Sequence, residues 1–405
     1  MPPYDGRDFE THAERVGNVL TRIAKRVESF WQRVTEGITL QVLWSQFVSE
    51  ARASYSLYSR EIDWDSLRKE TRSRRFLKTA SALFWALVMK LSPARRVFLL
   101  IALFFAIVAL TNSQVTISMS DSQHNYEVSP PSNFVPVLLS VSALLILLAL
   151  ELADRVTMKR DLEIARDIQR WLVPESPPQV PGVEIAFFSR PANTVGGDYY
   201  DAFLRAAPGS VPGTKRLLLV VADVAGKSVP AALLMATFQA SLRTLAEANT
   251  SLVELVEGMN RYACAHSLSG SRFTTAFFAE LEPETRGLSY IRAGHNVPLI
   301  RRASGNLEFL ETGDLPLGIN AETRFNCGAT TMGPHDLLVL FTDGLIEAVN
   351  DAGQEFGEPR VVEVLKASDG ASAQSTLKNL LGSVDAFVGH ARQHDDLTCL
   401  LLRTN

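Results

Sequence analysis

Residues 217–228 read LLLVVADVAGKS, and this stretch decides the fold class because it joins an apolar run to an aspartate and a glycine turn. An unbroken apolar run of this length, followed by turn residues, is typical of a strand buried on both faces. Asp223 comes directly after the run, so its carboxylate is expected at the rim of a sheet. The stretch therefore predicts a buried strand that ends in an acidic residue.

Short apolar runs of the same kind recur from Gly182 onward and alternate with helical patterns. Strands are expected in VEIAFF, RLLLVVAD, FTTAFFAEL, LSYIRAG, PLIRR, LLVLFTD and LTCLLLR. Helices are expected chiefly over residues 229–249, 252–265, 359–366 and 373–388. Because several strands are separated by hairpin-length turns, the pattern predicts an α+β domain in which helices cover antiparallel sheets.

The composition of the whole chain restricts its class. It has 405 residues, of which 46% are hydrophobic and 21% charged, so we expect two or three structural units. The formal net charge of -4 gives no global electrostatic reason to bind nucleic acid, and no nucleic-acid partner is expected. Cys264, Cys327 and Cys399 lie far apart and form no C-x-x-C pair, which argues against a disulfide framework or a structural zinc site.

Two long uncharged runs occur in the first half of the chain, at residues 97–110 and 134–150. Each run alone also fits a buried core helix, but no charged residue occurs between Arg96 and Asp121. Lys and Arg are numerous before the first run and after the second, and they are absent from residues 111–133. The positive-inside rule therefore predicts a two-span hairpin in the cell inner membrane, a multi-pass arrangement with both termini cytoplasmic.

These patterns divide the chain into four predicted regions. A cytoplasmic helical N-terminal region covers residues 1–92, the transmembrane hairpin 93–153, a helical signalling linker 154–176 and the α+β domain 177–405. The linker carries an apolar stripe at helical spacing, formed by Leu162, Ala165, Ile168 and Leu172. Such a stripe favours pairing with a second copy of the chain, although packing on its own domain is the alternative.

Acidic residues of the α+β domain gather at strand ends and in turns. They are Asp198 and Asp201 in VGGDYYDAF, Asp223, Asp343 in LLVLFTDGL, and Asp395 with Asp396 in HDDLTCLLLR. Each alone is explained as a turn former or a helix cap. Together, and with the glycines that flank them, they favour a binuclear site for hard divalent cations, Mg²⁺ or Mn²⁺. Zinc is disfavoured because histidine is scarce near these residues.

Two competing motifs are weaker. Gly226-Lys227-Ser228 looks like the end of a P-loop, but Val221 stands where that motif needs its first glycine. His295 in RAGHN has no serine elbow or cysteine partner, which favours a turn residue near the site over a catalytic base. The sequence therefore favours metal-dependent chemistry over a nucleoside triphosphatase.

Residues 161–403 resemble the bacterial RsbU/SpoIIE-type serine/threonine phosphatases of the metal-dependent PPM superfamily. The resemblance rests on segments in the same order, LEIARDIQRWLVP, VGGDYYDAF, VADVAGKSVPAALLMA, FTTAFFAEL, RAGHNVPLI, LPLGI, LVLFTDGLIEAVN and HDDLT. It implies a helix-flanked antiparallel β-sandwich with two Mn²⁺ or Mg²⁺ ions at one edge. By this resemblance Asp223 bridges the ions, Asp343 and Asp395 hold one of them, and Asp198 completes the cluster or binds through a water molecule.

The same resemblance implies the backbone carbonyl of Val224 as a further ligand, and it leaves the choice between Asp395 and Asp396 open. Ser228 stands where a glycine often closes the turn. The implied activity is hydrolysis of phosphoserine or phosphothreonine on an anti-anti-sigma-like regulatory protein by a metal-activated water, in a homodimer switched through its linker helix. The alternative is a membrane signalling scaffold with a non-catalytic phosphatase-like domain, whose signature would be the loss of a metal acid.

Overall fold

The computed structural model describes residues 88, 91–111, 134–206, 208, 215–248, 250–266 and 272–405. The prediction of a helical region over 1–92 lies almost wholly outside these residues. The chain divides into two compact units, residues 1–152 and 153–405.

The first unit contains helix α5 (Pro93–Thr111) and the first half of helix α6 (Phe134–Leu172). The two helices contact each other through small residues, since Ala102 and Ser140 are buried and Ser140 Oγ donates to the Ala102 carbonyl at 2.9 Å. Their large apolar side chains point outward and are exposed. Arg95 of α5 forms an ion pair with Glu151 of α6 at 3.1 Å, at the end of the two helices where charged residues occur. By length and composition both helices are candidate membrane spans, consistent with the predicted hairpin.

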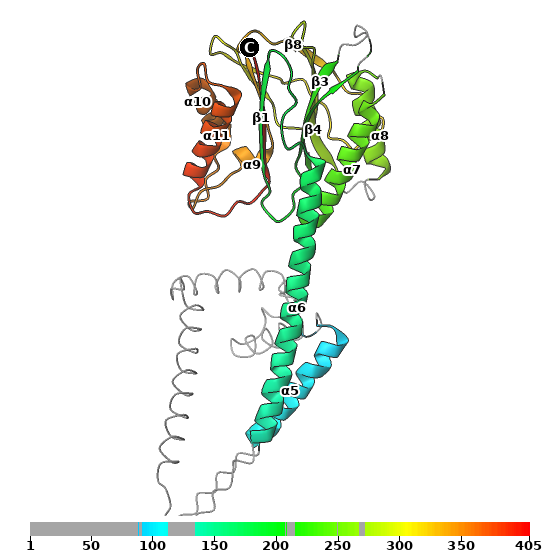
Figure 1. Ribbon diagram of the computed structural model, residues 1–405, viewed down its shortest axis with the longest axis vertical. Helices are drawn as coiled ribbons and strands as arrows, with labels where there is room; N and C mark the ends of the chain where they lie inside the picture. Colours follow the sequence, from blue (N-terminus) through cyan, green and yellow to red (C-terminus); the bar gives the residue numbers. More distant parts are fainter. Residues whose placement is uncertain are drawn as a thin grey trace, which may run out of the picture. The chain divides into compact units, whose positions relative to one another are not determined.

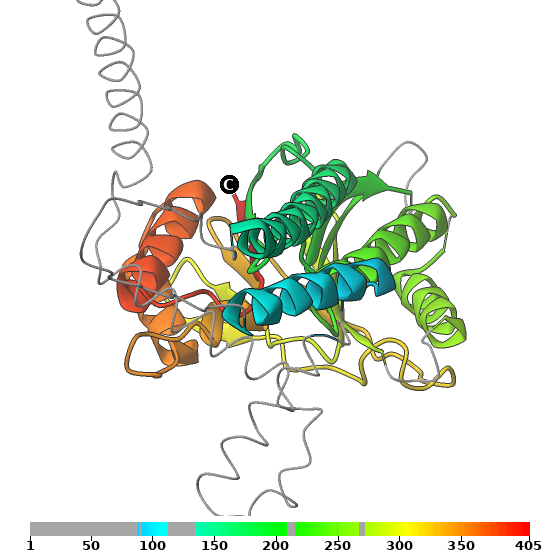
Figure 2. The ribbon, with the colours of Figure 1, turned by 90° about the horizontal axis from the view of Figure 1, so that it is seen from below.

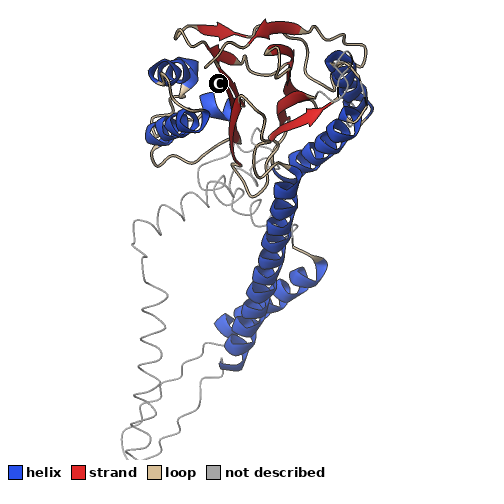
Figure 3. Ribbon diagram, turned by 45° about the horizontal axis from the view of Figure 1, so that its top comes forward, coloured by secondary structure: helices blue, strands red, loops and turns tan. Residues whose placement is uncertain are grey.

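The second unit is a sandwich of two antiparallel sheets, as the helix-flanked fold class predicted (Figures 1 and 3). One sheet has the order β1-β10-β9-β6-β7 and the other the order β2-β3-β4-β5-β8. The strand bounds are β1 Val183–Arg190, β2 Tyr199–Arg205, β3 Arg216–Val224, β4 Thr274–Leu281, β5 Gly287–Ala293, β6 Leu299–Arg301, β7 Leu307–Phe309, β8 Gly328–Thr331, β9 Leu337–Phe341 and β10 Leu397–Thr404.

Helices cover both outer faces of the sandwich (Figure 2). Helices α7 (Ser228–Ala246) and α8 (Leu252–Ala265) pack on the sheet that contains β3. Helices α10 (Gly357–Ala367) and α11 (Ala373–Val388) pack on the sheet that contains β10, and the short helix α9 (Asp343–Ile346) follows β9. The four predicted helical stretches correspond to α7, α8, α10 and α11. Helix α8 begins at a capping box formed by Ser251 and Glu254, which satisfies two backbone donors of its first turn.

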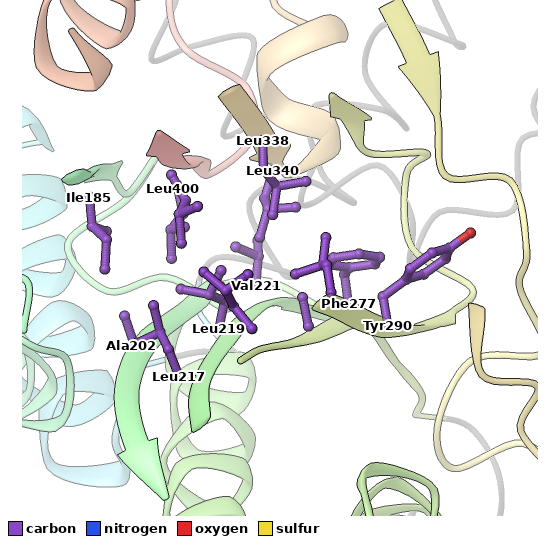
Figure 4. Packing of buried hydrophobic residues seen from close by; sticks show 14 of the residues in the cluster. Ile185, Ala202, Leu217, Leu219, Val221, Phe277, Tyr290, Leu338, Leu340 and Leu400 are labelled. Carbon is purple, nitrogen blue, oxygen red and sulfur yellow. The ribbon is translucent and has the colours of Figure 1, made fainter. Parts of the chain in front are cut away.

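The alternation of side chains in β3 explains its continuous apolar sequence. Leu217, Leu219 and Val221 point into the core between the two sheets, where they meet Phe277 and Leu340 (Figure 4). The intervening residues of β3 point to the other side and pack under α7 and α8. Because successive side chains of a strand face opposite sides, a strand between two apolar layers needs an apolar residue at every position.

The turn between β3 and α7 is tight. Gly226 has φ 126° and Ser228 has φ 61°, so two residues of this short connection adopt the left-handed region. A serine in this region costs about 1 kcal/mol relative to glycine. This geometry gives the physical reason why a glycine is favoured at the position of Ser228.

Candidate metal centre

The predicted acidic residues lie at one edge of the sandwich. Asp198 immediately precedes β2, and Asp223 is the second-last residue of β3. Strands β2 and β3 pair so that Tyr199 faces Ala222, which brings the two carboxylates to the same end of the sheet. Asp343 follows β9 and Asp395 precedes β10, and these strands pair so that Phe341 faces Cys399. Antiparallel pairing places the end of one strand beside the start of the next, which is why residues from four parts of the chain meet.

Close packing at glycines brings these segments into contact. A Cβ atom at Gly197 would lie 2.9 Å from the Val224 carbonyl oxygen and 3.6 Å from Asp223 Oδ1. A Cβ atom at Gly344 would lie 2.0 Å from the Asp396 carbonyl oxygen. Any side chain at these two positions would push the acidic segments apart, so the glycines are required by the approach of the backbone.

The carboxylates of this edge interact electrostatically. Burial, and then the charges of Asp343 and Asp395, raise the pKa of Asp223 to about 7. Burial and the charge of Asp395 raise the pKa of Asp343. The pKa of Asp198 is raised well above its usual value, first by burial and then by Asp223. Like charges held this close favour a bound cation.

The two carboxylate oxygens of Asp198 differ in their hydrogen bonding. Its Oδ2 accepts a hydrogen bond from Thr342 Oγ1 at 2.8 Å. Its Oδ1 is buried and has no hydrogen-bond partner among the described residues. A buried carboxylate oxygen without a partner is costly, and a cation would satisfy it.

The adjacent residues Asp395 and Asp396 have different partners. Asp396 Oδ1 accepts from the Ala192 N–H at 2.7 Å, and Asp396 Oδ2 accepts from the Gly197 N–H at 2.6 Å. Both carboxylate oxygens of Asp396 are therefore used to hold the loop before Asp198. Asp395 Oδ2 instead accepts from the Lys227 ammonium group at 2.9 Å, and its Oδ1 accepts from the Asp396 N–H at 3.0 Å.

Of two other residues from the sequence analysis, Asp201 points away from this edge, whereas His295 lies near it, because its partner Thr275 pairs with Asp223. Asp201 is fully buried and accepts hydrogen bonds from the Tyr199 hydroxyl and from Arg243 Nε and Nη2 on α7, the latter two at 2.8 and 2.7 Å. The alternation of β2 turns Asp201 toward α7, so it belongs to a structural network. His295 is buried, its Nδ1 lies 3.1 Å from Thr275 Oγ1, and burial lowers its pKa to about 4.

Sequence reasoning missed Gln169 at the end of α6. Its Nε2 donates to the Gly196 carbonyl at 2.7 Å, and its Oε1 accepts from the Gly196 N–H at 3.2 Å. This pair of bonds ties the linker helix to the loop that carries Asp198. Beside it lies a cavity of about 540 Å³, lined from α6 by Lys159, Arg166 and Arg170 and from the sandwich by Asp198 and Asp396. The available sequence signal was that Gln169 belongs to LEIARDIQRWLVP, one of the segments that carry the family resemblance.

The side chains of this edge have the right chemistry for a hard divalent cation, because all are oxygen donors. As placed, no three His, Cys, Asp or Glu side chains of the described residues converge closely enough to enclose an ion. The unpartnered Asp198 oxygen and the mutual repulsion of Asp223 and Asp343 nevertheless fit a cation site.

The family model described as Stage II sporulation protein E (SpoIIE) matches residues 213–405. The chain is 28% identical over 247 residues to the phosphoserine phosphatase RsbU of Bacillus subtilis (strain 168), a match that covers 61% of this chain and 70% of RsbU. The predicted resemblance to the RsbU/SpoIIE-type phosphatases is thereby confirmed.

Two further matches concern the extent of the chain and its fold. Protein IcfG of Synechocystis sp. (strain ATCC 27184 / PCC 6803 / Kazusa) is 27% identical over 288 residues, 64% of this chain and 44% of IcfG, so the chain spans less than half of that relative. The SiaA-PP2C domain of Pseudomonas aeruginosa aligns with a TM-score of 0.54 at 20% identity, covering 62% of this chain and 99% of that domain. The second unit of this chain therefore has the fold of a PP2C domain.

Proposed function

We propose that this chain is a membrane-anchored, metal-dependent protein serine/threonine phosphatase that acts on a phosphorylated, anti-anti-sigma-like regulatory protein. The observation that carries the proposal is the cluster of Asp198, Asp223, Asp343 and Asp395 at one edge of a SpoIIE-type domain. The similarity to RsbU, a phosphoserine phosphatase, supports the reaction and the class of substrate. No acidic residue expected at the site is missing, which argues against a non-catalytic scaffold.

We assign the cation ligands to Asp198, Asp223, the Val224 carbonyl, Asp343 and Asp395. Asp396 is assigned to the loop instead, because both of its oxygens already accept backbone N–H groups. When bound, a pair of Mn²⁺ or Mg²⁺ ions supplies an activated water for in-line attack and neutralises the phosphoryl oxygens.

The residues of the chain itself hold the geometry of this reaction. Thr342 orients Asp198 through its hydroxyl, and the same hydroxyl accepts from the Thr398 N–H at 3.0 Å. Thr342 is fully buried, so it fixes Asp198 relative to both β9 and β10. Asp396 fixes the backbone on the other side of Asp198 through Gly197. Together these contacts orient Asp198 before any substrate arrives.

We also infer that α5 and the first half of α6 anchor the chain in the inner membrane as a hairpin, with both termini in the cytoplasm. The composition of the two helices and the absence of Lys and Arg from residues 111–133 support this topology. We place the hairpin between residues 93 and 153 and the linker between residues 154 and 176.

We further infer that two copies pair through the linker half of α6, on a face that shares only Ile168 with the predicted stripe. Leu162, Ala165 and Leu172 are only partly exposed. Ile164, Ile168 and Trp171 are 50%, 49% and 79% exposed and follow one another at helical spacing. This second set is the apolar face that a partner helix could cover.

The test is phosphate release from a purified phosphorylated anti-anti-sigma-type domain by the full chain in detergent, with and without Mn²⁺. We expect Mn²⁺-dependent turnover that Asp223→Asn reduces by at least 1,000-fold, an effect consistent with loss of a metal-activated nucleophile. Asp351→Asn, which makes the same chemical change in an exposed turn, serves as the matched control. Binding of the phosphoprotein without turnover under all metal conditions would instead support the scaffold.

A further inference from the structure

Lys227 lies in the tight turn between β3 and α7, at the acidic edge. Its Nζ donates to Asp395 Oδ2 at 2.9 Å and to the His394 carbonyl at 2.9 Å. The side chain is 59% exposed, and that of Asp395 is 40% exposed, so neither is locked by packing. The contact joins the turn after β3 to the segment before β10.

The ammonium group acts on more than one carboxylate. The hydrogen bond to Asp395 is the largest cause that raises the pKa of Lys227, and the charges of Asp396 and Asp343 act in the same direction. The positive charge of Lys227 in turn opposes the rise in the pKa of Asp223 and Asp343. Lys227 is thus an intramolecular cation placed among mutually repelling carboxylates.

The contact with Lys227 uses a carboxylate oxygen of a proposed metal ligand. Asp395 is the proposed ligand whose oxygen is turned to a side-chain cation. A divalent ion at that oxygen would bring a second cation close to the ammonium group, and the two would repel.

We propose that Lys227 is an internal counter-ion of the metal centre, which neutralises Asp395 in the metal-free protein and must release it before an ion binds. This inference rests on the proposed function. It assigns to Lys227 an influence on the affinity of the site for its metal ions. Lys227 therefore weakens metal binding while it stabilises the empty site. An ordinary exposed ion pair would stabilise the fold slightly and leave the metal affinity unchanged.

The test measures Mn²⁺ binding by the full chain in detergent, from the electron paramagnetic resonance signal of free Mn²⁺. Lys227→Gln removes the charge and is expected to lower the dissociation constant about three- to tenfold. Lys227→Arg keeps the charge and is expected to bind Mn²⁺ with an affinity close to that of the wild type. Lys378→Gln, at an exposed position on α11, controls for the loss of a positive charge elsewhere.

An unchanged or weaker affinity of Lys227→Gln, with Mn²⁺ binding and turnover intact in the wild type, would overturn this inference and leave the proposed function standing. Absence of Mn²⁺ binding by the wild type would overturn both. A second measurement is thermal unfolding in EDTA, in which Lys227→Gln is expected to unfold at a lower temperature than Lys227→Arg. Equal unfolding temperatures for these two variants would contradict the counter-ion role.

Discussion

Asp395 and Asp396 are neighbours of the same residue type, yet the structure predicts opposite effects on stability when each is replaced by alanine. Asp396→Ala removes two charge-assisted hydrogen bonds, to the Ala192 and Gly197 N–H groups at 2.7 and 2.6 Å. A hydrogen bond to a charged group is worth about 1.5–3 kcal/mol, and relief of repulsion from the other acids returns part of it. We therefore expect a loss of about 2–4 kcal/mol in the free energy of unfolding.

For a unit of this size, each kcal/mol corresponds to a shift of about 2–4 °C in Tm, so Asp396→Ala should lower Tm by roughly 10 °C. Asp395→Ala removes an exposed pair with Lys227 and the hydrogen bond from the Asp396 N–H, and it relieves repulsion on Asp223. Its expected effect on Tm in EDTA is within about 2 °C of zero. Both variants are compared with the wild type as full chains in detergent, by thermal unfolding followed by far-UV circular dichroism.

Mn²⁺ binding provides the second half of this comparison. Asp395→Ala should lose high-affinity Mn²⁺ binding with its fold intact, whereas Asp396→Ala should keep measurable binding with a destabilised loop. Equal losses of Tm in EDTA for Asp395→Ala and Asp396→Ala would refute the assignment of Asp396 to the loop. So would an Asp395→Ala variant that binds Mn²⁺ as tightly as the wild type.

Three further predictions concern other parts of the chain. Burial lowers the folded-state pKa of His295 to about 4, against about 6.5 in the unfolded chain, so His295 contributes about 3 kcal/mol above pH 6.5 that is lost as the pH falls toward 4. In urea unfolding, the wild type should therefore lose up to about 3 kcal/mol more stability than His295→Asn over this window, and an equal loss in both proteins would contradict the burial of a neutral imidazole. In intact cells, a cysteine at Ser122 should react with a membrane-impermeant thiol reagent and one at Ser176 should not, and labelling at Ser176 alone would reverse the topology. Ile164→Asp with Ile168→Asp should lower self-association in analytical ultracentrifugation while the fold persists, and an unchanged dimer fraction would exclude that face.

Local sequence patterns were sufficient for the α+β class and for most of its strands and helices, but they did not predict β2, β7, β8 or the short helix α9. The apolar run of β3 indicated a strand covered on both sides, and the structure places an apolar layer on each. The helical periods of α7, α8, α10 and α11 were equally visible, because amphipathic spacing is a local property. The position of Asp223 and Asp343 at strand ends could be predicted for the same reason, since a strand end is marked by its own residues.

The tertiary structure alone decided which polar groups meet. Asp198 and Asp201 lie in one short motif, but the alternation of β2 turns Asp201 toward Arg243. The assignment of Asp395 and not Asp396 as a ligand depends on the backbone N–H groups that Asp396 accepts. Which face of the linker helix is exposed depends on where Gln169 binds Gly196. These contacts join segments distant in sequence, and they depend on strand register and loop packing. A local pattern specifies that a residue is polar and near a turn, whereas its partner is specified only when the sheets are assembled.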